Sequence, residues 1–262
     1  MKRIALITGA SSGIGAAFAR RLASQGYDLI ITGRRKDKIE ALAGELENTY
    51  GTAVELVIAE LAAPEQVQEL VQKIKATPEL DVLVNNAGFG VLGDFAEGRI
   101  EEQVAMIDVH VLATVRLTHA ALPAMLARGK GAVINVSSIS AWTPLARNTL
   151  YGATKAFLTF FSEALHMELA GSGVRVQALC PGFTRTDFHA RLGVEDAQRR
   201  DQGPIKWMSP EQVVDASLRG LERGTVVCVP GFWNQLIVGL LGFLPRRLYY
   251  RLAARANKPP WE

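Results

Sequence analysis

The chain has few residues of the kinds that build covalent or metal-bound frameworks. Its 262 residues include only two cysteines, Cys180 and Cys228, and four histidines. The cysteines lack the spacing of a metal site, and the histidines do not cluster with one another or with carboxylates at ligand spacing. We therefore predict no metal centre, and two reduced thiols in the core of a protein from a reducing compartment.

Long apolar runs and blocks of one charge are also absent. The longest apolar run, from Leu236 to Leu244, is well below the roughly 18–20 residues that span a bilayer. The five residues between Arg3 and Gly9 are too few for the apolar part of a secretory signal. The net charge is +3 without a block of lysine or arginine, so nothing indicates nucleic-acid binding. We expect a cytoplasmic protein with no nucleic-acid partner.

Apolar runs of strand length alternate along the chain with segments of helical periodicity. This alternation predicts βαβ units around a parallel sheet, with helices on both faces because the runs are continuously apolar. Chains of about 250 residues often form one such unit, so we expect one domain over residues 1–230 and a helical extension over 231–262. The expected strands are Ile4–Thr8, Asp28–Thr32, Val54–Ile58, Val82–Asn85, Ala132–Val136, Val174–Leu179 and Val226–Val229. The expected helices are Gly13–Gln25, Asp37–Thr49, Pro64–Lys75, Arg99–Arg128, Tyr151–Ala170 and Pro210–Glu222.

Prolines and glycines mark the expected starts and ends of helices, and one long segment is expected to be irregular. Pro64 and Pro210 suit the first turn of a helix. A loop as long as 182–209 in a compact domain is usually functional, and we predict that this segment is a lid. The glycines that suit helix ends are Gly26, Gly129, Gly171 and Gly224.

A glycine-rich turn joins the first expected strand to the first expected helix. Gly9, Gly13 and Gly15 stand there in the order G-x-x-x-G-x-G. The first glycine permits a tight turn, the second lets the backbone approach a pyrophosphate, and the third lets helix and strand pack closely. The positive end of the helix dipole would face the anion. The turn therefore predicts a dinucleotide site.

The residues at the tip of the second expected strand indicate which dinucleotide binds. A site for NAD(H) wants a carboxylate there for the ribose hydroxyls, whereas this chain has Gly33, Arg34 and Arg35. A guanidinium can pair bidentately with the 2′-phosphate of NADP(H). We therefore predict NADP(H) as the cofactor. The alternative is that Arg34 and Arg35 are simply solvated at the start of a helix.

A serine, a tyrosine and a lysine form a second candidate site. Tyr151 and Lys155 are four residues apart, which places them on one face of a helix. A nearby ammonium is expected to draw the pKa of the phenol down from its usual value of about 10. Ser138 closes a strand, where its hydroxyl could bind a substrate carbonyl and stabilise an oxyanion. We predict that Tyr151 moves a proton, that Lys155 lowers its pKa and holds the nicotinamide ribose, and that Ser138 orients the carbonyl.

Two further segments extend the pattern: Asn85-Asn86-Ala87-Gly88, and Pro181-Gly182 followed by Thr184 and Thr186. In order and spacing, the motifs together resemble the short-chain dehydrogenase/reductase family, in its short single-domain branch, over about residues 3–230. The resemblance implies a Rossmann-type, doubly wound, parallel seven-stranded sheet with helices on both faces. It also implies a homodimer or homotetramer.

The resemblance assigns cofactor contacts residue by residue. It implies that the stretch 86–88 lies on the adenosine side, and that the segment after Pro181-Gly182 contacts the nicotinamide carboxamide and the phosphates. The expected catalytic residues are Ser138, Tyr151 and Lys155. The expected cofactor-binding residues are Gly9, Ser11, Ser12, Gly13, Ile14, Gly15, Arg34, Arg35, Glu60, Leu61, Asn86, Ala87, Gly88, Tyr151, Lys155, Pro181, Gly182, Thr184 and Thr186.

Two positions depart from the family pattern. The family commonly has an aspartate near the adenine, and Glu60 stands in that stretch here. The family's fourth catalytic residue is an asparagine, and His110 aligns with it. A histidine could hold a water near the lysine or join a proton relay with a pH-dependent charge. It could equally fill space in a helix, so His110 is left outside the expected catalytic set.

The lid and the tail carry the remaining signals. The tail Phe232–Arg255 places Arg247, Arg251 and Arg255 on one helical stripe. It could pack over the substrate cleft or a partner subunit, lie on a membrane surface, or be plainly solvated. Apolar side chains beside the motifs or inside the lid favour an apolar substrate; they are Trp142, Leu145, Phe183, Phe188, Trp207 and Met208.

These observations predict an NADP(H)-dependent oxidoreductase that acts on CH–OH groups. It would interconvert an apolar ketone or aldehyde and the corresponding alcohol. Epimerase or dehydratase chemistry is disfavoured because no further substrate domain of about 80 or more residues is appended. The alternative from another class is a catalytically silent NADP(H)-binding sensor or scaffold, against which the intact serine, tyrosine and lysine weigh.

Overall fold

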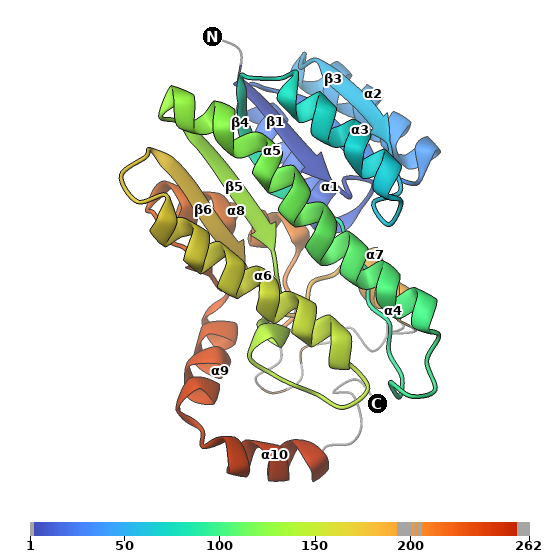
Figure 1. Ribbon diagram of the computed structural model, residues 1–262, viewed down its shortest axis with the longest axis vertical. Coiled ribbons are helices and arrows are strands. Elements are labelled where there is room, and N and C mark those ends of the chain that lie inside the picture. The colour runs from blue at the N-terminus through green and yellow to red at the C-terminus, as the bar shows by residue number, and fades with distance from the viewer. Residues whose placement is uncertain (1–2, 193–200, 202, 204–205, 256–262) are drawn as a thin grey trace.

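Seven parallel strands form one twisted sheet in the computed structural model, which describes residues 3–192, 201, 203 and 206–255 (Figure 1). The strands are β1 (Arg3–Thr8), β2 (Tyr27–Gly33), β3 (Val54–Ile58), β4 (Leu80–Asn85), β5 (Gly131–Val136), β6 (Val174–Leu179) and β7 (Val227–Cys228). Their order is β3-β2-β1-β4-β5-β6-β7, and all pairs are parallel. The chain winds outward to both sides of β1 and β4, so the predicted doubly wound Rossmann-type sheet is confirmed.

Helices cover both faces of this sheet. The α-helices of the described residues are α1 (Gly13–Ser24), α2 (Lys36–Tyr50), α3 (Pro64–Lys75), α4 (Ile100–Ile107), α5 (Ala113–Arg128), α6 (Thr149–Glu168), α7 (Asp187–Arg191), α8 (Pro210–Glu222), α9 (Phe232–Phe243) and α10 (Arg246–Arg255). One core packs α1, α2 and α8 on the sheet, around Phe18, Ile39 and Val213. The other packs α3, α5 and α6 on the opposite face, around Leu70 and Leu117 (Figure 1).

The apolar pattern of the sequence locates these elements closely. The strand β4 is buried along its whole length, as expected of a strand with helices on both faces. The elements β3, β6, α3 and α8 have the predicted bounds, and the other strands differ from them by at most two residues. The four glycines predicted at helix ends all have φ between +62° and +79°, the left-handed conformation that ends a helix.

The segment expected as one helix over 99–128 has a π-helical turn inside it. Between α4 and α5 lies η1 (Asp108–Leu112), which carries His110. Such turns are rare and occur frequently at functional sites. Among the described residues, Ile100–Arg128 is also the one helix with the length and apolarity of a membrane span, and half of an apolar 18-residue part of it is buried. Its second part, α5, packs on β4 and β5 beside α3, as a core helix does.

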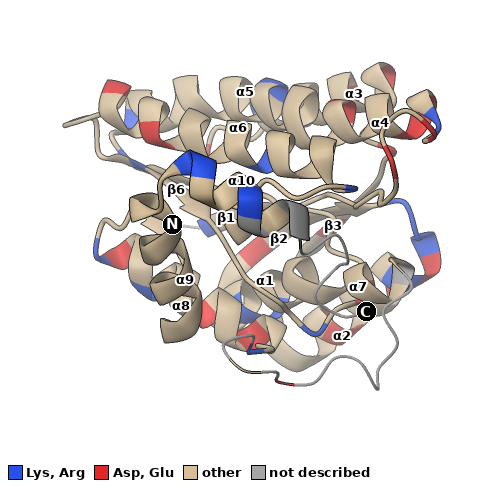
Figure 2. Cartoon of the chain, turned by 90° about the horizontal axis from the view of Figure 1, so that it is seen from below, with Lys and Arg blue, Asp and Glu red and all other residues tan. Residues whose placement is uncertain are grey.

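The lid and the tail meet at the carboxyl edge of the sheet. The lid segment 182–209 holds the short helix α7, which sequence reasoning missed, and a bridge between Thr184 and Met208 joins its two ends. Residues 193–200, 202 and 204–205 of the lid lie outside the described residues. The helix α10 crosses beneath the carboxyl ends of the strands (Figures 1 and 2).

Candidate active site

Gly9 brings the glycine-rich turn against the end of β4. Its φ is +66°, and a Cβ at this position would lie 2.7 Å from the Cα of Ala87. The side-chain amide of Asn86 donates to the carbonyl oxygens of Thr8 (2.8 Å) and Gly9 (3.1 Å). In return, the Thr8 hydroxyl accepts from the backbone N–H groups of Asn86 and Ala87. The turn and the segment after β4 therefore form one unit.

The first turn of α1 is open to an anion. Its N-cap residue, Ser12, has an extended backbone and makes no side-chain bond to the helix. Gly15 packs against Gly9 so closely that a Cβ would lie 2.5 Å from the Gly9 carbonyl oxygen, while Ile14 packs on the core. Free backbone N–H groups and the positive end of the helix dipole suit a pyrophosphate. The groups present at this turn thus fit the predicted dinucleotide.

Arg34 and Arg35 lie at the tip of β2 but have different partners. Arg34 pairs with Glu60 at 2.9 Å and is more than half exposed. Arg35 lies over the glycine-rich turn, where its guanidinium donates to the hydroxyls of Ser11 (2.8 Å) and Ser12 (2.6 Å). These two serines hold the guanidinium beside the anion-binding turn. Of the two arginines, Arg35 is the better placed to meet a phosphate bound there.

Arg35 also pairs with a carboxylate that sequence reasoning missed. Asp187, the first residue of α7, accepts from Arg35 at 3.0 Å and from Lys38 at 3.3 Å. The hydrogen bond from Arg35 lowers the pKa of Asp187 to about 2, so this carboxylate is ionised at neutral pH. Its neighbour Thr186 covers the turn, where a Cβ on Gly13 would lie 2.9 Å from the threonine methyl group. The start of the lid rests directly on the predicted phosphate site.

Ser138, Tyr151 and Lys155 come together at the carboxyl end of β5. The hydroxyl of Ser138 accepts from the backbone N–H of Ser140 at 3.1 Å and is hydrogen-bonded to the Tyr151 hydroxyl. The ammonium of Lys155 lies 5.5 Å from the centre of the Tyr151 ring and donates to the carbonyl of Val136 at 2.8 Å. The helical spacing that placed the tyrosine and the lysine on one face of α6 therefore brings both to the serine.

The pKa of Tyr151 differs from the expectation. Burial raises it to about 12, and the hydrogen bond to Ser138 offsets only part of that rise. Burial likewise lowers the pKa of Lys155 to about 8. The expected drop in the phenol's pKa is absent because burial dominates, while the ammonium of Lys155 gives its hydrogen bond to a backbone carbonyl. In this structure Tyr151 is a protonated acid at neutral pH, which suits proton donation.

His110 is a fixed, neutral side chain behind the tyrosine. Its Nε2 accepts from the backbone N–H of Phe89 at 3.1 Å, which assigns the ring proton to Nδ1, 2.9 Å from the Thr154 hydroxyl. That hydroxyl donates in turn to the carbonyl of Tyr151 at 2.8 Å. Burial, and then the charge of Lys155, hold the pKa of His110 well below its usual value. A relay in which His110 gains charge is therefore disfavoured, and the ring instead connects the segment after β4 to α6.

Aromatic side chains from the lid face Tyr151. The ring of Phe188 lies 5.6 Å from the ring of Tyr151, between centres. Further into the lid, Trp207 packs on Phe183 at 5.2 Å and on His189 at 4.8 Å. The reacting hydroxyl is thus bordered by an apolar wall.

The tail also reaches this site. The Tyr249 hydroxyl of α10 donates to the carbonyl of Pro144 at 2.7 Å, in the loop that carries Trp142 and Leu145. On α9, the buried Asn234 packs so closely on Gly182 that a Cβ there would lie 2.4 Å from its side-chain oxygen. These contacts argue against a plainly solvated tail, because the tail packs on the loop after Ser138 and on the start of the lid.

The remaining predicted cofactor residues are structural neighbours of the site. Pro181 and Thr184 are buried below the lid, where the Thr184 hydroxyl donates to the carbonyl of Gly182 at 3.0 Å. Leu61 is buried in one of the two cores, so its side chain serves packing and only its backbone is left to contact a cofactor. A Cβ on Gly88 would lie 2.7 Å from Nε2 of His110, which ties this glycine to the histidine.

A buried polar chain supports the site from below. The Asn85 side-chain amide donates to the side-chain carbonyl of Asn135 at 2.9 Å, and Asn135 donates to the hydroxyl of Ser162 at 2.9 Å. This chain joins the ends of β4 and β5 to α6, which carries Tyr151. Asparagines near the carboxyl ends of two neighbouring strands are the sequence signal that could have revealed it.

Comparison with known proteins decides the family. A family model of short chain dehydrogenases matches residues 3–196, which is most of the chain. The chain belongs to the short-chain dehydrogenase family. An oxidoreductase of Staphylococcus saprophyticus is 35% identical to it over 87% of this chain and 94% of its own length. This short-chain dehydrogenase is therefore an oxidoreductase.

Solved structures agree with this placement. A short-chain dehydrogenase from Sphingobium yanoikuyae, in complex with NADPH, superposes with a TM-score of 0.82 at 34% identity and covers 94% of this chain and 97% of its own. The bulky-bulky ketone specific alcohol dehydrogenase from Comamonas testosteroni superposes with a TM-score of 0.78 at 31% identity and covers 93% and 95%. The short-chain dehydrogenase described here shares their fold over nearly its whole length.

Proposed function

We propose that this short-chain dehydrogenase interconverts an apolar ketone or aldehyde and the corresponding alcohol with NADP(H). The observation that carries the proposal is the hydrogen-bonded pair Ser138–Tyr151 beside Lys155. It places a protonated phenol, a second hydroxyl and a cation at one point on the carboxyl edge of the sheet. A reduced nicotinamide bound there would supply the hydride to the carbonyl carbon.

The protein's own side chains supply the proton that the substrate oxygen takes up and stabilise the negative charge that develops during the reaction. The Tyr151 hydroxyl gives its proton to the carbonyl oxygen of the substrate, which becomes the alcohol. The Ser138 hydroxyl donates to the same oxygen and stabilises its developing charge. Lys155, fixed by the Val136 carbonyl, stabilises the phenolate that remains. His110 acts as a positioning residue, through Thr154 and the backbone of Tyr151.

The arginine over the glycine-rich turn supports NADP(H) as the cofactor. Arg35 is held there by Ser11 and Ser12, and β2 has no carboxylate at its carboxyl end. A guanidinium suits the 2′-phosphate, which NAD(H) lacks. The relative from Sphingobium yanoikuyae was solved with NADPH, which is consistent with this choice.

An apolar substrate is supported by the wall around the reacting hydroxyl. Phe188 of the lid faces Tyr151, and α10 contacts the loop after Ser138. The related enzyme from Comamonas testosteroni is specific for bulky-bulky ketones. We therefore infer that a ketone with large apolar groups on both sides is a better substrate than a small polar one.

Loss of NADPH absorbance with a panel of ketones and aldehydes tests the function. We expect turnover with NADPH, fastest for the bulky apolar ketones in the panel. A panel without turnover, together with tight binding of NADPH by calorimetry, would favour the sensor or scaffold instead. Equal rates for small polar and bulky apolar carbonyls would contradict the substrate class while leaving the reaction intact.

We further propose a cytoplasmic homodimer or homotetramer. The outer side of α6 supports association, because Phe157, Phe160 and Met167 are exposed there and contiguous apolar surface of this kind commonly marks an interface. Light scattering coupled to size exclusion should give two or four times the 28.4 kDa mass of the chain. A monomeric mass would contradict this proposal.

The rate of carbonyl reduction is expected to fall as the pH rises through about 8. Burial lowers the pKa of Lys155 to about 8, so its ammonium loses its proton in that range, while Tyr151, with a pKa of about 12, keeps its own. The deprotonated lysine no longer stabilises the phenolate left by proton transfer. The measurement is kcat/KM between about pH 6 and pH 10. Lys155→Arg keeps its charge, so a decline of that variant at the same pH would contradict this assignment.

Asp187→Asn is expected to tighten NADPH binding about two- to fivefold, the size of an exposed ion pair. The Asp187 carboxylate forms an ion pair with the guanidinium of Arg35, so it competes with a 2′-phosphate for that guanidinium. Because NADH lacks this phosphate, the substitution should leave NADH binding unchanged. Asp201→Asn is the matched control, because Asp201 pairs with Lys206 elsewhere in the lid. Weaker NADPH binding by Asp187→Asn would show instead that the carboxylate holds Arg35 in place for the cofactor.

A further inference from the structure

The helix α9 presents an apolar stripe to solvent. Phe232, Leu236, Leu240 and Phe243 follow one another at helical spacing and are 71%, 40%, 63% and 91% exposed. Asn234, on the other side of the helix, is buried against the chain. No polar side chain interrupts the exposed stripe, and large exposed apolar patches mark interaction sites. This stripe is not used by the site around Tyr151.

The segment that carries the stripe is rich in arginine and nearly free of carboxylates. Residues 216–255 contain six arginines and one acidic residue, Glu222. On α10, Arg246, Arg247 and Arg251 are exposed, and in Figure 2 this helix carries blue bands and no red. None of these three arginines has an ion-pair partner among the described residues, whereas eleven other arginine or lysine residues in the described part of the chain do form such pairs.

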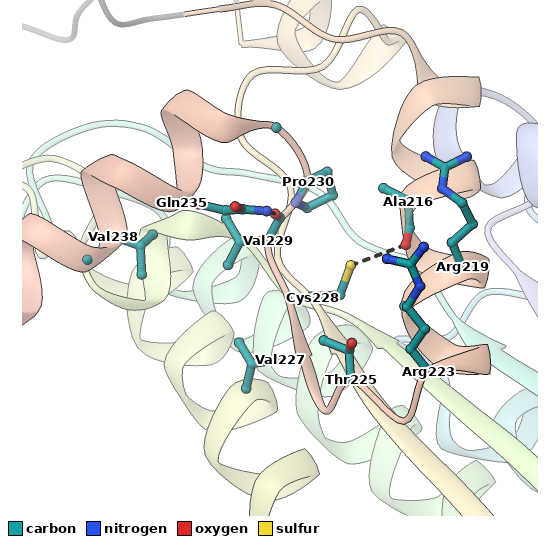
Figure 3. A pocket seen from close by; sticks show the side chains of 13 residues that line it. Ala216, Arg219, Arg223, Thr225, Val227, Cys228, Val229, Pro230, Gln235 and Val238 are labelled. Carbon is teal, nitrogen blue, oxygen red and sulfur yellow. Dashed lines mark hydrogen bonds between the residues drawn. The ribbon is translucent and has the colours of Figure 1, made fainter.

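Two more arginines lie at a cavity between α8 and α9. Arg219 lies in the last turn of α8, Arg223 directly follows this helix, and Val238 lines the cavity from α9 (Figure 3). The cavity measures about 480 Å³, and Val227 and Val229 contribute to its apolar wall. Neither arginine forms an ion pair within the described part of the chain. A hollow with two guanidiniums and an apolar wall suits an anionic headgroup.

We propose that α9, α10 and the arginine end of α8 dock this protein on an anionic lipid bilayer. The apolar stripe enters the boundary between headgroups and acyl chains, and the arginines bind lipid phosphates. With 12 residues, α9 is too short to span a bilayer, so it lies along the surface. The contact is independent of the oxidoreductase activity.

Charge favours a lipid surface over a second copy of the chain. A two-fold interface would place the same surface of each copy against the other. The exposed arginines of α10, Arg246, Arg247 and Arg251, would then lie in an interface with the same arginines of the other copy, and like charges across an interface oppose association. Anionic headgroups carry the opposite charge. Tyr249 meanwhile fixes α10 to the body of the protein, so docking would hold the carboxyl edge of the sheet near the membrane.

Sedimentation of the full chain with vesicles tests the proposal. We expect binding to vesicles with about one third phosphatidylglycerol, little binding to pure phosphatidylcholine, and a loss of binding as salt increases. Phe243→Glu and Arg247→Glu should each weaken binding about fivefold or more. The matched controls are Ile100→Glu and Lys75→Glu, which alter exposed residues on other elements and should bind as the unmodified protein does.

Three outcomes would overturn the proposal. They are no binding to anionic vesicles, equal binding to both kinds of vesicle, and unchanged binding by both tail variants. If vesicle binding is absent and Phe243→Glu lowers the mass in light scattering, the stripe is an interface between copies instead. Ketone reduction measured without vesicles should be the same for all four variants, which separates this proposal from the enzymatic one.

Discussion

Tyr151→Phe is expected to abolish carbonyl reduction and to leave NADPH binding nearly unchanged. The substitution keeps the ring, with its edge contact to His110 and its packing on Phe188, and removes only the hydroxyl bonded to Ser138. Loss of a general acid lowers the rate by about 10²- to 10⁴-fold. The measurements are kcat for a bulky ketone and the Kd of NADPH by fluorescence titration.

The matched control for this loss is Tyr249→Phe. It also removes one tyrosine hydroxyl, which donates to the Pro144 carbonyl, but it leaves the group of Ser138, Tyr151 and Lys155 intact. We expect kcat within about threefold of the unmodified enzyme, because a single neutral hydrogen bond contributes about 1 kcal/mol. If Tyr151→Phe kept a tenth or more of the activity, the assignment of Tyr151 as the proton donor would be wrong.

Arg35→Gln is expected to remove the preference for NADPH over NADH. A hydrogen-bonded charge pair contributes about 1.5–3 kcal/mol, so the Kd of NADPH should rise by about 10- to 150-fold, while that of NADH, which lacks the 2′-phosphate, should barely change. Arg34→Gln should act more weakly, because Arg34 is more exposed and is paired with Glu60. Both constants can be measured by calorimetry with the same protein samples.

The two cofactors serve as internal controls for each other. A fold defect in Arg35→Gln would weaken NADH and NADPH alike, whereas loss of a phosphate contact affects only NADPH. An unmodified enzyme that binds NADH more tightly would contradict the proposed cofactor. If Arg35→Gln kept the preference for NADPH and Arg34→Gln lost it, the contact with the 2′-phosphate would be assigned to Arg34.

The fold could be predicted from the sequence because its signals are local. A strand such as β4 is buried on both faces, and its apolar run Val82–Val84 indicates this. Glycines such as Gly129 end helices at the point where the backbone must turn left-handed. The interruption at η1 was missed, because a π-helical turn of five residues has no periodicity of its own to distinguish it from the helices on both sides.

The sequence predicted only those parts of the candidate site that follow from the spacing of residues along the chain. Four-residue spacing in a helix was enough to bring Tyr151 and Lys155 together, and Ser138 followed from its place at the end of a strand. The pairing of Arg35 with Asp187 joins residues 152 positions apart, and no pattern along the chain connects them. The raised pKa of Tyr151 was not predicted either. It depends on how deeply the folded protein buries the phenol and not on which residues are its neighbours in sequence.

The two cysteines have a practical consequence for labelling experiments. Cys180 and Cys228 are free and buried, and burial raises the pKa of their thiols to about 12 and about 11. At pH 8 only about one thiol in a thousand or fewer would be the reactive thiolate. A cysteine introduced at an exposed position such as Phe243 would therefore take up a maleimide dye selectively. A fluorophore or spin label could be attached to the tail without first removing either native cysteine.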